Sequence, residues 1–202
     1  YSQELKIDHQ FDFKDLNILL NFLDKNIYKI EKLIGNFIKN IILIVENEKN
    51  LKINMGIKKS YETALKQKSF SSNLTELKDL FKKNYQDQTI MHMCIINYII
   101  DGKRYSSFDT KLINDYFCIE VSFIAIDNKL VFAFDNVLEK YQIKIKQYMC
   151  GNYINNFIGD TGDEISIIAN KLRNGLNINE ITIVPKHKEN KGFFEKFFQL
   201  FS

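Results

Sequence analysis

The sequence has 202 residues, and it contains little proline, no tryptophan and no long apolar run. The chain has a single proline, and 45% of its residues are hydrophobic. This composition differs from that of a disordered chain. No apolar run approaches the roughly 18 to 20 residues that span a bilayer, and the run at 41–45 has the length of a strand. We therefore expect one or two small globular domains and no transmembrane helix.

Cysteine is also scarce, and the charges of the two signs nearly cancel. The three cysteines form an odd set without CxxC spacing, which predicts reduced core thiols in a cytoplasmic protein: Cys94, Cys118 and Cys150. The net charge is only +3. A charge this small does not favour nucleic-acid binding, so we expect no nucleic acid among the partners.

The first half of the chain alternates between helical and strand patterns. Apolar residues at three- and four-residue steps predict a helix over residues 12–34, with Asp12 as its N-cap and Gly35 as its stop. Two segments, 38–48 and 51–61, then predict strands joined by a polar turn at 47–50.

A second helix is predicted within residues 69–86, with Ser72 or Asn73 as its N-cap. Its apolar face would consist of four residues at helical spacing: Leu74, Leu77, Leu80 and Phe81.

The second half continues in the same way. Strands are predicted over 89–102 and 118–127, the first ending in the turn signal Asp101-Gly102. A helix over 129–142 and a strand over 143–149 follow, then a helix over 164–173 and a short strand over 180–184. This order of elements predicts an α+β fold, a mixed sheet with helices packed on it.

The C-terminus is unusually apolar, with five phenylalanines in its last ten residues. On a helical wheel the apolar residues of 192–202 fall within about 160°, and polar residues fill the other side. Pro185 and a polar run separate this segment from the preceding domain. The pattern predicts an amphipathic helix that binds an anionic membrane, and the alternatives are a helix that closes the protein's own core and a helix that docks onto a partner protein. The predicted membrane-binding residues are Phe193, Phe194, Phe197, Phe198, Leu200, Phe201, Lys188, Lys191 and Lys196.

Residues suited to catalysis or metal binding are few. The histidines His9, His92 and His187 lack paired metal-ligand spacing, and His92 is expected to be a core or edge histidine with its hydrogen bonds satisfied. The acidic residues of IGDTGDE (158–164) could hold a cation or act on phosphate, but a surface turn that leads into a helix is favoured. We therefore predict no catalytic residue, no metal and no cofactor.

Several tyrosines lie near basic residues in the middle of the chain. Tyr98, Tyr105 and Tyr116 accompany Lys103 and Arg104, which could form a stacking surface for nucleic acid. Isolated aromatic residues in strands are more often core or rim residues, and this is the interpretation we favour.

The order of elements, together with specific residues, resembles the bacterial cell-division protein FtsA. The stretches KNIILIVENE, KINMGIKKSY, TELKDLFKKNY and IMHMCIINYIIDGKRY are similar to the FtsA segment in which an actin-like subdomain leads into a strand-helix-strand-strand insertion. In that family a strand carries a histidine and ends in apolar-apolar-Asp-Gly, as His92 and residues 99–102 do here. The resemblance covers residues 12–157, and the amphipathic tail is also a feature of FtsA-like proteins.

The resemblance implies a domain organisation. Its parts are a partial actin-like subdomain (1–50), a strand-helix-strand-strand domain (51–157), a helix-strand remnant (158–184), a linker (185–191) and a membrane-targeting helix (192–202).

The resemblance also implies a function. The protein would be a cell-division scaffold at the cytoplasmic face of the inner membrane at the division site, with anionic lipids, division proteins and its own copies as partners. About 45 residues follow Phe157, too few for the second actin-like lobe, so we expect no ATPase activity. That lobe is also where FtsA recognises FtsZ, so binding of FtsZ does not follow. The alternatives are a PilM-like or other actin-derived interaction scaffold and a partial actin-like ATPase.

Overall fold

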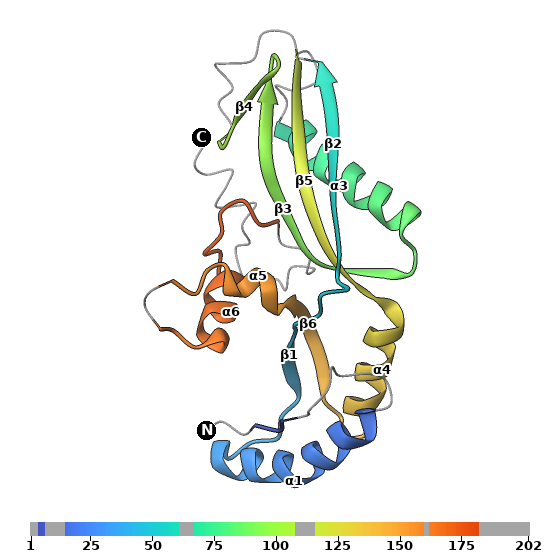
Figure 1. The fold of residues 1–202 in the computed structure, drawn as a ribbon, viewed down its shortest axis with the longest axis vertical. Helices are drawn as coiled ribbons and strands as arrows, with labels where there is room; N and C mark the ends of the chain where they lie inside the picture. Colours follow the sequence, from blue (N-terminus) through green and yellow to red (C-terminus); the bar gives the residue numbers. More distant parts are fainter. Residues whose placement is uncertain (1–3, 7–14, 61–66, 108–115, 160–161, 182–202) are drawn as a thin grey trace. The chain divides into compact units, whose positions relative to one another are not determined.

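The computed structural model describes residues 4–6, 15–60, 67–107, 116–159 and 162–181 (Figure 1). The described chain contains both helices and strands in two separate sheets, which confirms the predicted α+β class. It divides into two compact units. Unit 1 comprises Tyr1–Leu43 and Asn128–Tyr148, and unit 2 comprises Ile44–Asp127 and Met149–Ser202.

Unit 1 is built around two helices and a pair of parallel strands. Helix α1 (Leu16–Ile34) ends as predicted at Gly35, whose φ of 69° is the left-handed conformation that glycine adopts readily. Asp15 precedes the helix, and the predicted cap, Asp12, lies outside the described residues. Strands β1 (Asn40–Val45) and β6 (Lys144–Cys150) form the pair, and the last residues of each strand belong to unit 2.

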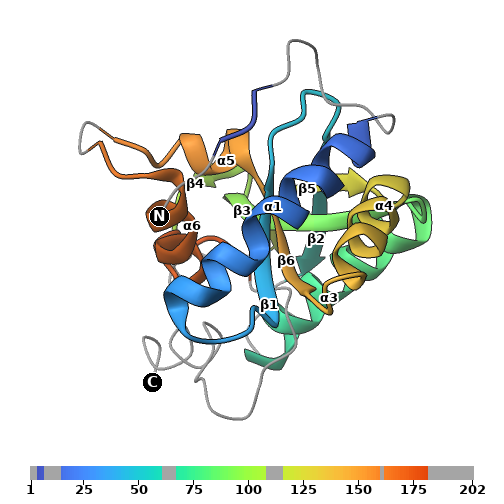
Figure 2. The ribbon, with the colours of Figure 1, turned by 90° about the horizontal axis from the view of Figure 1, so that it is seen from below.

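Helix α4 (Asn128–Glu139) lies beside α1 (Figure 2). Two tyrosine hydroxyls tie these elements together. Tyr141 donates to Asp24 Oδ1 at 2.6 Å, next to the Leu20 carbonyl, and Tyr148 of β6 donates to Asp135 Oδ1 at 2.7 Å. Burial and the neighbouring carboxylates raise the pKa of both phenols, so the hydroxyls remain donors at neutral pH.

Unit 2 contains an antiparallel sheet with strand order β2-β5-β3-β4. Its strands are β2 (Leu51–Ser60), β3 (Gln88–Ile100), β4 (Lys103–Tyr105) and β5 (Tyr116–Asp127). Helix α3 (Gln67–Asn84) connects β2 to β3 and packs on one face of the sheet (Figure 1). The shared core includes Leu77, Phe81, Ile119, Val121 and Phe123, each no more than 1% exposed.

The predicted start of the second helix is wrong. Helix α3 begins at Gln67, so Ser72 and Asn73 lie inside the helix and neither is its N-cap. Leu80 is also misassigned, because it is 44% exposed while Leu77 and Phe81 are buried. Three- and four-residue steps define a broad stripe, and only contact with the sheet decides which members of the stripe are covered.

The turn between β3 and β4 confirms the Asp101-Gly102 prediction. Both residues have positive φ, 46° and 84°, the conformation of a two-residue hairpin turn that suits a right-handed twist. Two register shifts interrupt the pairing of β3 with β5, one between Ile90 and His92 and one between Ile95 and Asn97. Each extra residue changes which side chains point to which face.

The C-terminal part of unit 2 closes the free edge of β3. Helices α5 (Gly151–Asn155) and α6 (Ile165–Arg173) pack together, and the chain then runs beside β3. The Ile95 amide donates to the Asn179 carbonyl, and the Ile181 amide donates to the Met93 carbonyl. Of the strand predicted over 180–184, the described residues show an isolated bridge between Glu180 and Cys94.

Candidate functional site

The only histidine among the described residues lies at the centre of a buried polar cluster in unit 2. His92 of β3 is 0% exposed. Its Nε2 accepts a hydrogen bond from the Cys150 backbone N–H at 2.9 Å, and its Nδ1 lies 2.7 Å from Oε1 of Glu180. Because Nε2 must supply a lone pair to the backbone donor, the ring proton resides on Nδ1 and is donated to the carboxylate.

Tyr153 of α5 extends the cluster. Its hydroxyl donates to Oε2 of Glu180 at 2.9 Å and accepts from Nδ2 of Asn177 at 2.8 Å. The thiol of Cys94 lies 3.4 Å from the same hydroxyl, and the Tyr153 ring packs against the His92 ring with centroids 4.1 Å apart. Both oxygens of Glu180 are therefore used, one by His92 and one by Tyr153.

A cysteine, a histidine and a glutamate lie together in this cluster, as they do in some catalytic sites. The geometry leaves neither His92 free to act as a base nor Cys94 ready to act as a nucleophile. The His92 nitrogen that would act as a base is occupied by the Cys150 amide. Burial, more than any other cause, raises the pKa of Cys94 to about 12, so its sulfur remains a protonated thiol and a poor nucleophile at neutral pH. Burial likewise raises the pKa of Tyr153.

The cluster instead joins three distant parts of unit 2. It connects β3 to α5 through Tyr153 and to the 177–181 segment through Asn177 and Glu180. The prediction of a satisfied, buried histidine is confirmed. Its partners were not predicted, because a single glutamate before an apolar run and a tyrosine in a polar stretch carry no spacing signal.

The acidic cluster of 158–164 is not assembled as a cation site in the described residues. Lys171 Nζ contacts Asp163 Oδ2 at 2.6 Å, and Glu164 precedes the first turn of α6, where it accepts from Ser166 Oγ at 3.3 Å. Asp160 lies outside the described residues. Within the part of the chain that the structure describes, no three His, Cys, Asp or Glu side chains come together as metal ligands.

The three tyrosines do not form a stacking surface. Tyr98 is 2% exposed and belongs to the core, and Tyr105 packs against that core. Tyr116 lies under Lys58, whose Nζ is 3.7 Å from the ring centroid. Arg104 faces Glu120, at 3.6 Å between Nη2 and Oε1. The preferred interpretation as core and rim residues is confirmed.

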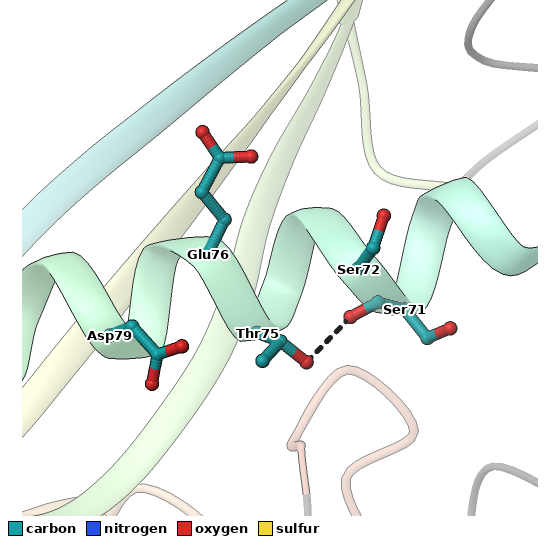
Figure 3. A pocket seen from close by; sticks show the side chains of 5 residues that line it. All are labelled: Ser71, Ser72, Thr75, Glu76 and Asp79. Atoms are coloured by element: carbon teal, nitrogen blue, oxygen red, sulfur yellow. Dashed lines mark hydrogen bonds between the residues drawn. The ribbon is translucent and has the colours of Figure 1, made fainter.

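Two shallow hollows are present in the described residues, one in each unit. The hollow in unit 2, of about 530 Å³, follows the outer face of α3 and is lined by polar side chains of that helix: Ser71, Ser72, Thr75, Glu76 and Asp79 (Figure 3). The hollow in unit 1, of about 430 Å³, lies between α1 and the end of α4 and includes Asp24 and Tyr141. Neither combines the apolar walls and convergent polar groups typical of a small-molecule site.

All nine residues predicted to bind a membrane, together with His9 and His187, lie outside the described residues. None of the described helices is long and apolar enough to cross a bilayer.

Comparison with known protein families finds no family model that matches this sequence, and comparison with curated proteins finds no matching relative. The described structure therefore shows an α+β protein in which His92 is held by hydrogen bonds from both ring nitrogens inside unit 2.

Proposed function

We propose that this protein is an FtsA-like scaffold of cell division, attached to the cytoplasmic face of the inner membrane by its C-terminal amphipathic segment and without ATPase activity. The observation that carries the proposal is the order of elements in unit 2. Along the chain come the strand β2, the helix α3 and the two long strands β3 and β5, with only the three-residue β4 between β3 and β5, and β5 lies between β2 and β3 in the sheet. This is the strand-helix-strand-strand order that the sequence resemblance implies.

Two further features of unit 2 support the proposal. The histidine of the resembling segment is a fixed structural residue, with both ring nitrogens bonded inside the unit. The apolar-apolar-Asp-Gly sequence forms the β3–β4 turn, where the Tyr116 amide donates to Asp101 Oδ1 at 3.1 Å. Unit 2 is thus a folded module joined internally by hydrogen bonds, which suits a role in presenting surfaces to partner proteins.

The tail supplies the membrane part of the proposal from its sequence pattern. Burial of a full phenylalanine side chain contributes about 1.5 to 3 kcal/mol, and a lysine near an anionic surface adds about 1 kcal/mol. Six apolar residues and three nearby lysines therefore suffice for reversible binding even if each aromatic side chain is only half buried. A helix of this length is not stable alone in water, so we expect it to form at the lipid surface.

The test is sedimentation of the full chain with vesicles of phosphatidylethanolamine and phosphatidylglycerol. The double variant Phe194→Glu/Phe197→Glu places charge in the centre of the apolar face and should abolish binding. The matched control, Gln199→Glu/Ser202→Glu, adds the same charge on the polar side and should retain most binding. Lys188→Glu/Lys191→Glu should weaken binding mainly at low salt, because exposed charges are screened within about 10 Å at 0.1 M salt.

The same variants test the cellular part of the proposal. A fluorescent fusion of the wild-type protein should concentrate at the division site, and the double phenylalanine variant should spread through the cell. Circular dichroism of that variant should match the wild type. If the variant unfolds and the wild type ignores vesicles, the tail belongs to the protein's core and the membrane proposal is wrong.

A further inference from the structure

Strand β2 lies at one edge of the sheet in unit 2 (Figure 1). Among the described residues it pairs with β5 alone, and its residues 51–60 do so without a register shift. In an antiparallel pair successive residues point their backbone groups to opposite sides. Every second N–H and C=O of β2 is therefore directed away from β5, over a length of about 33 Å. The opposite edge of the sheet, β4, has only three residues.

The charge on this edge strand is entirely positive. β2 carries Lys52, Lys58 and Lys59 and no acidic residue. Lys59 forms an ion pair with Glu76 of α3, on the packed face of the sheet. Lys52 and Lys58 belong to the other face, where both are exposed, and among the described residues neither forms an ion pair. Lysines on an edge strand repel a second strand of the same kind and attract acidic side chains.

A glycine stands in the middle of β2. Gly56 does not have a positive φ, and its pairing with β5 is regular. An added Cβ would lie 3.4 Å from Cys118 Sγ and 3.7 Å from Glu120 Cγ, and both are ordinary contacts. Neither the backbone nor the packing of the described residues therefore requires glycine at this position. Glycine inside a strand weakens it and often marks a place that another chain approaches closely.

The side chain opposite Gly56 does not cover it. Glu120 of β5 is held from the far side, where its Oε2 accepts from Asn97 Nδ2 at 2.7 Å and its Oε1 lies 3.6 Å from Arg104 Nη2. Gly56 remains exposed. An aromatic side chain on a neighbouring strand is a known cover for a glycine at a sheet edge. The edge thus offers a cation, an uncovered glycine and a second cation in one row.

We propose that the free edge of β2 binds an extended acidic segment of a partner protein, which adds to the sheet as an antiparallel strand. Its backbone bonds to the outward N–H and C=O groups of β2. Acidic side chains lie opposite Lys52 and Lys58, and an aromatic side chain covers Gly56. On the packed face, apolar side chains of the segment extend the row of Met55 and Ile57, which are only partly buried without it.

A partner segment is favoured over a second copy of this chain. Two copies of β2 paired with each other would bring three lysines from each strand together without any acidic residue. The inference extends the proposed scaffold role, because it gives unit 2 a partner of defined chemistry. Its test uses no lipid, so its failure would leave the membrane proposal standing.

Titration of the full chain with synthetic peptides, followed by NMR, tests the proposal. The peptide Glu-Val-Phe-Val-Thr-Val-Glu places its glutamates opposite Lys58 and Lys52 and its phenylalanine opposite Gly56. At saturation it should slow exchange of the outward amides of 51–60 by about tenfold or more. Lys-Val-Phe-Val-Thr-Val-Lys should bind about tenfold more weakly or not at all. Of two acidic peptides N-methylated at odd-numbered or even-numbered residues, only one should bind, because only one set of amides faces β2.

Two variants and a control test the residues. Lys52→Glu/Lys58→Glu should weaken binding of the acidic peptide by about tenfold, chiefly at low salt. Gly56→Val should also weaken it, yet unfold in urea no earlier than the wild type, because β-branched residues suit strands. The control Lys25→Glu/Lys29→Glu reverses the same charge on exposed positions of α1 in unit 1 and should leave binding unchanged.

Failure of the acidic peptide to bind, or equal binding of the acidic and basic peptides, would overturn the proposal. Protection of every amide of 51–60 in the free protein at all concentrations would also overturn it, because the edge would already be paired within the chain. Protection that grows with protein concentration in the absence of peptide would overturn it as well, and would assign the edge to a second copy.

Discussion

Replacement of Glu180 by alanine should destabilise unit 2 strongly, because its carboxylate accepts from two donors inside the fold. His92 Nδ1 lies 2.7 Å from one oxygen, and the Tyr153 hydroxyl lies 2.9 Å from the other. His92 is fully buried and the Glu180 side chain is 14% exposed, so water reaches this site poorly. Alanine leaves both donors without their acceptor.

The expected loss of stability follows from the two hydrogen-bond donors that lose their acceptor. A buried polar group that loses its partner costs about 1 to 3 kcal/mol. The fully buried His92 belongs near the upper end of this range, and Tyr153 belongs lower because the Cys94 sulfur, 3.4 Å from its hydroxyl, can accept from it weakly. The partial exposure of the site admits some water and reduces the sum. We therefore expect Glu180→Ala to lower the free energy of unfolding by about 3 kcal/mol, a large fraction of the usual 5 to 15.

Urea unfolding followed by circular dichroism measures this loss. Tyr153→Phe should cost about 1 to 2 kcal/mol, because it removes the hydroxyl but leaves the His92–Glu180 bond intact. Both substitutions remove the same Tyr153–Glu180 bond, so the double variant should cost less than the two single losses added together, by about 1 kcal/mol. Glu48→Ala removes an exposed carboxylate in the same unit and should stay within about 0.5 kcal/mol of the wild type.

The reasoning is refuted if Glu180→Ala resembles Glu48→Ala. It is also refuted if the losses of Glu180→Ala and Tyr153→Phe add without coupling, since the bond between them would then contribute nothing.

Three other outcomes are expected. Leu77→Ala should cost about 2 to 5 kcal/mol in urea unfolding, and Leu80→Ala, one turn along the same helix at 44% exposure, should cost far less; equal losses would contradict the placement of α3. Gly35→Ala should lower the free energy of unfolding by about 1 kcal/mol, because the φ of Gly35 is 69°. Gly159→Ala is the control and should be near neutral. An added Cβ has no neighbour within 4 Å at either position, but Gly159 does not have a positive φ. Unfolding stability should fall as pH rises above 9, because unfolded Cys94 loses its proton near 9.0 while the folded thiol, with its pKa raised to about 12, keeps it. The slope from Cys94 approaches about 1.4 kcal/mol per pH unit. Cys94→Ala should reduce the slope between pH 9 and 10 but not abolish it, because burial also raises the pKa of Cys118.

Much of the local structure could be predicted because its cause lies within a few residues. Gly35 ends α1 and Asp101-Gly102 turns the chain, since both places need a positive φ. β2 alternates over ten residues because one face is packed and the other is open. These patterns were sufficient for the α+β class, for the order of the long elements and for the expectation that His92 is buried and satisfied.

The sequence by itself therefore determined where most helices and strands lie along the chain. The tertiary structure decided which of their residues are buried and which distant residues come into contact. Five consecutive residues of β3, 91–95, are buried. Helix α3 covers one face of the sheet at this strand, and α5 and residues 177–181 cover the remaining side chains. The two register shifts change which side chains of β3 point to each face. The site depends still more on the fold, because His92 and Glu180 are 88 residues apart in the chain and 2.7 Å apart in space. A hydrogen bond depends on distance and angle between two groups, and for groups so far apart in sequence only the packed fold sets these values.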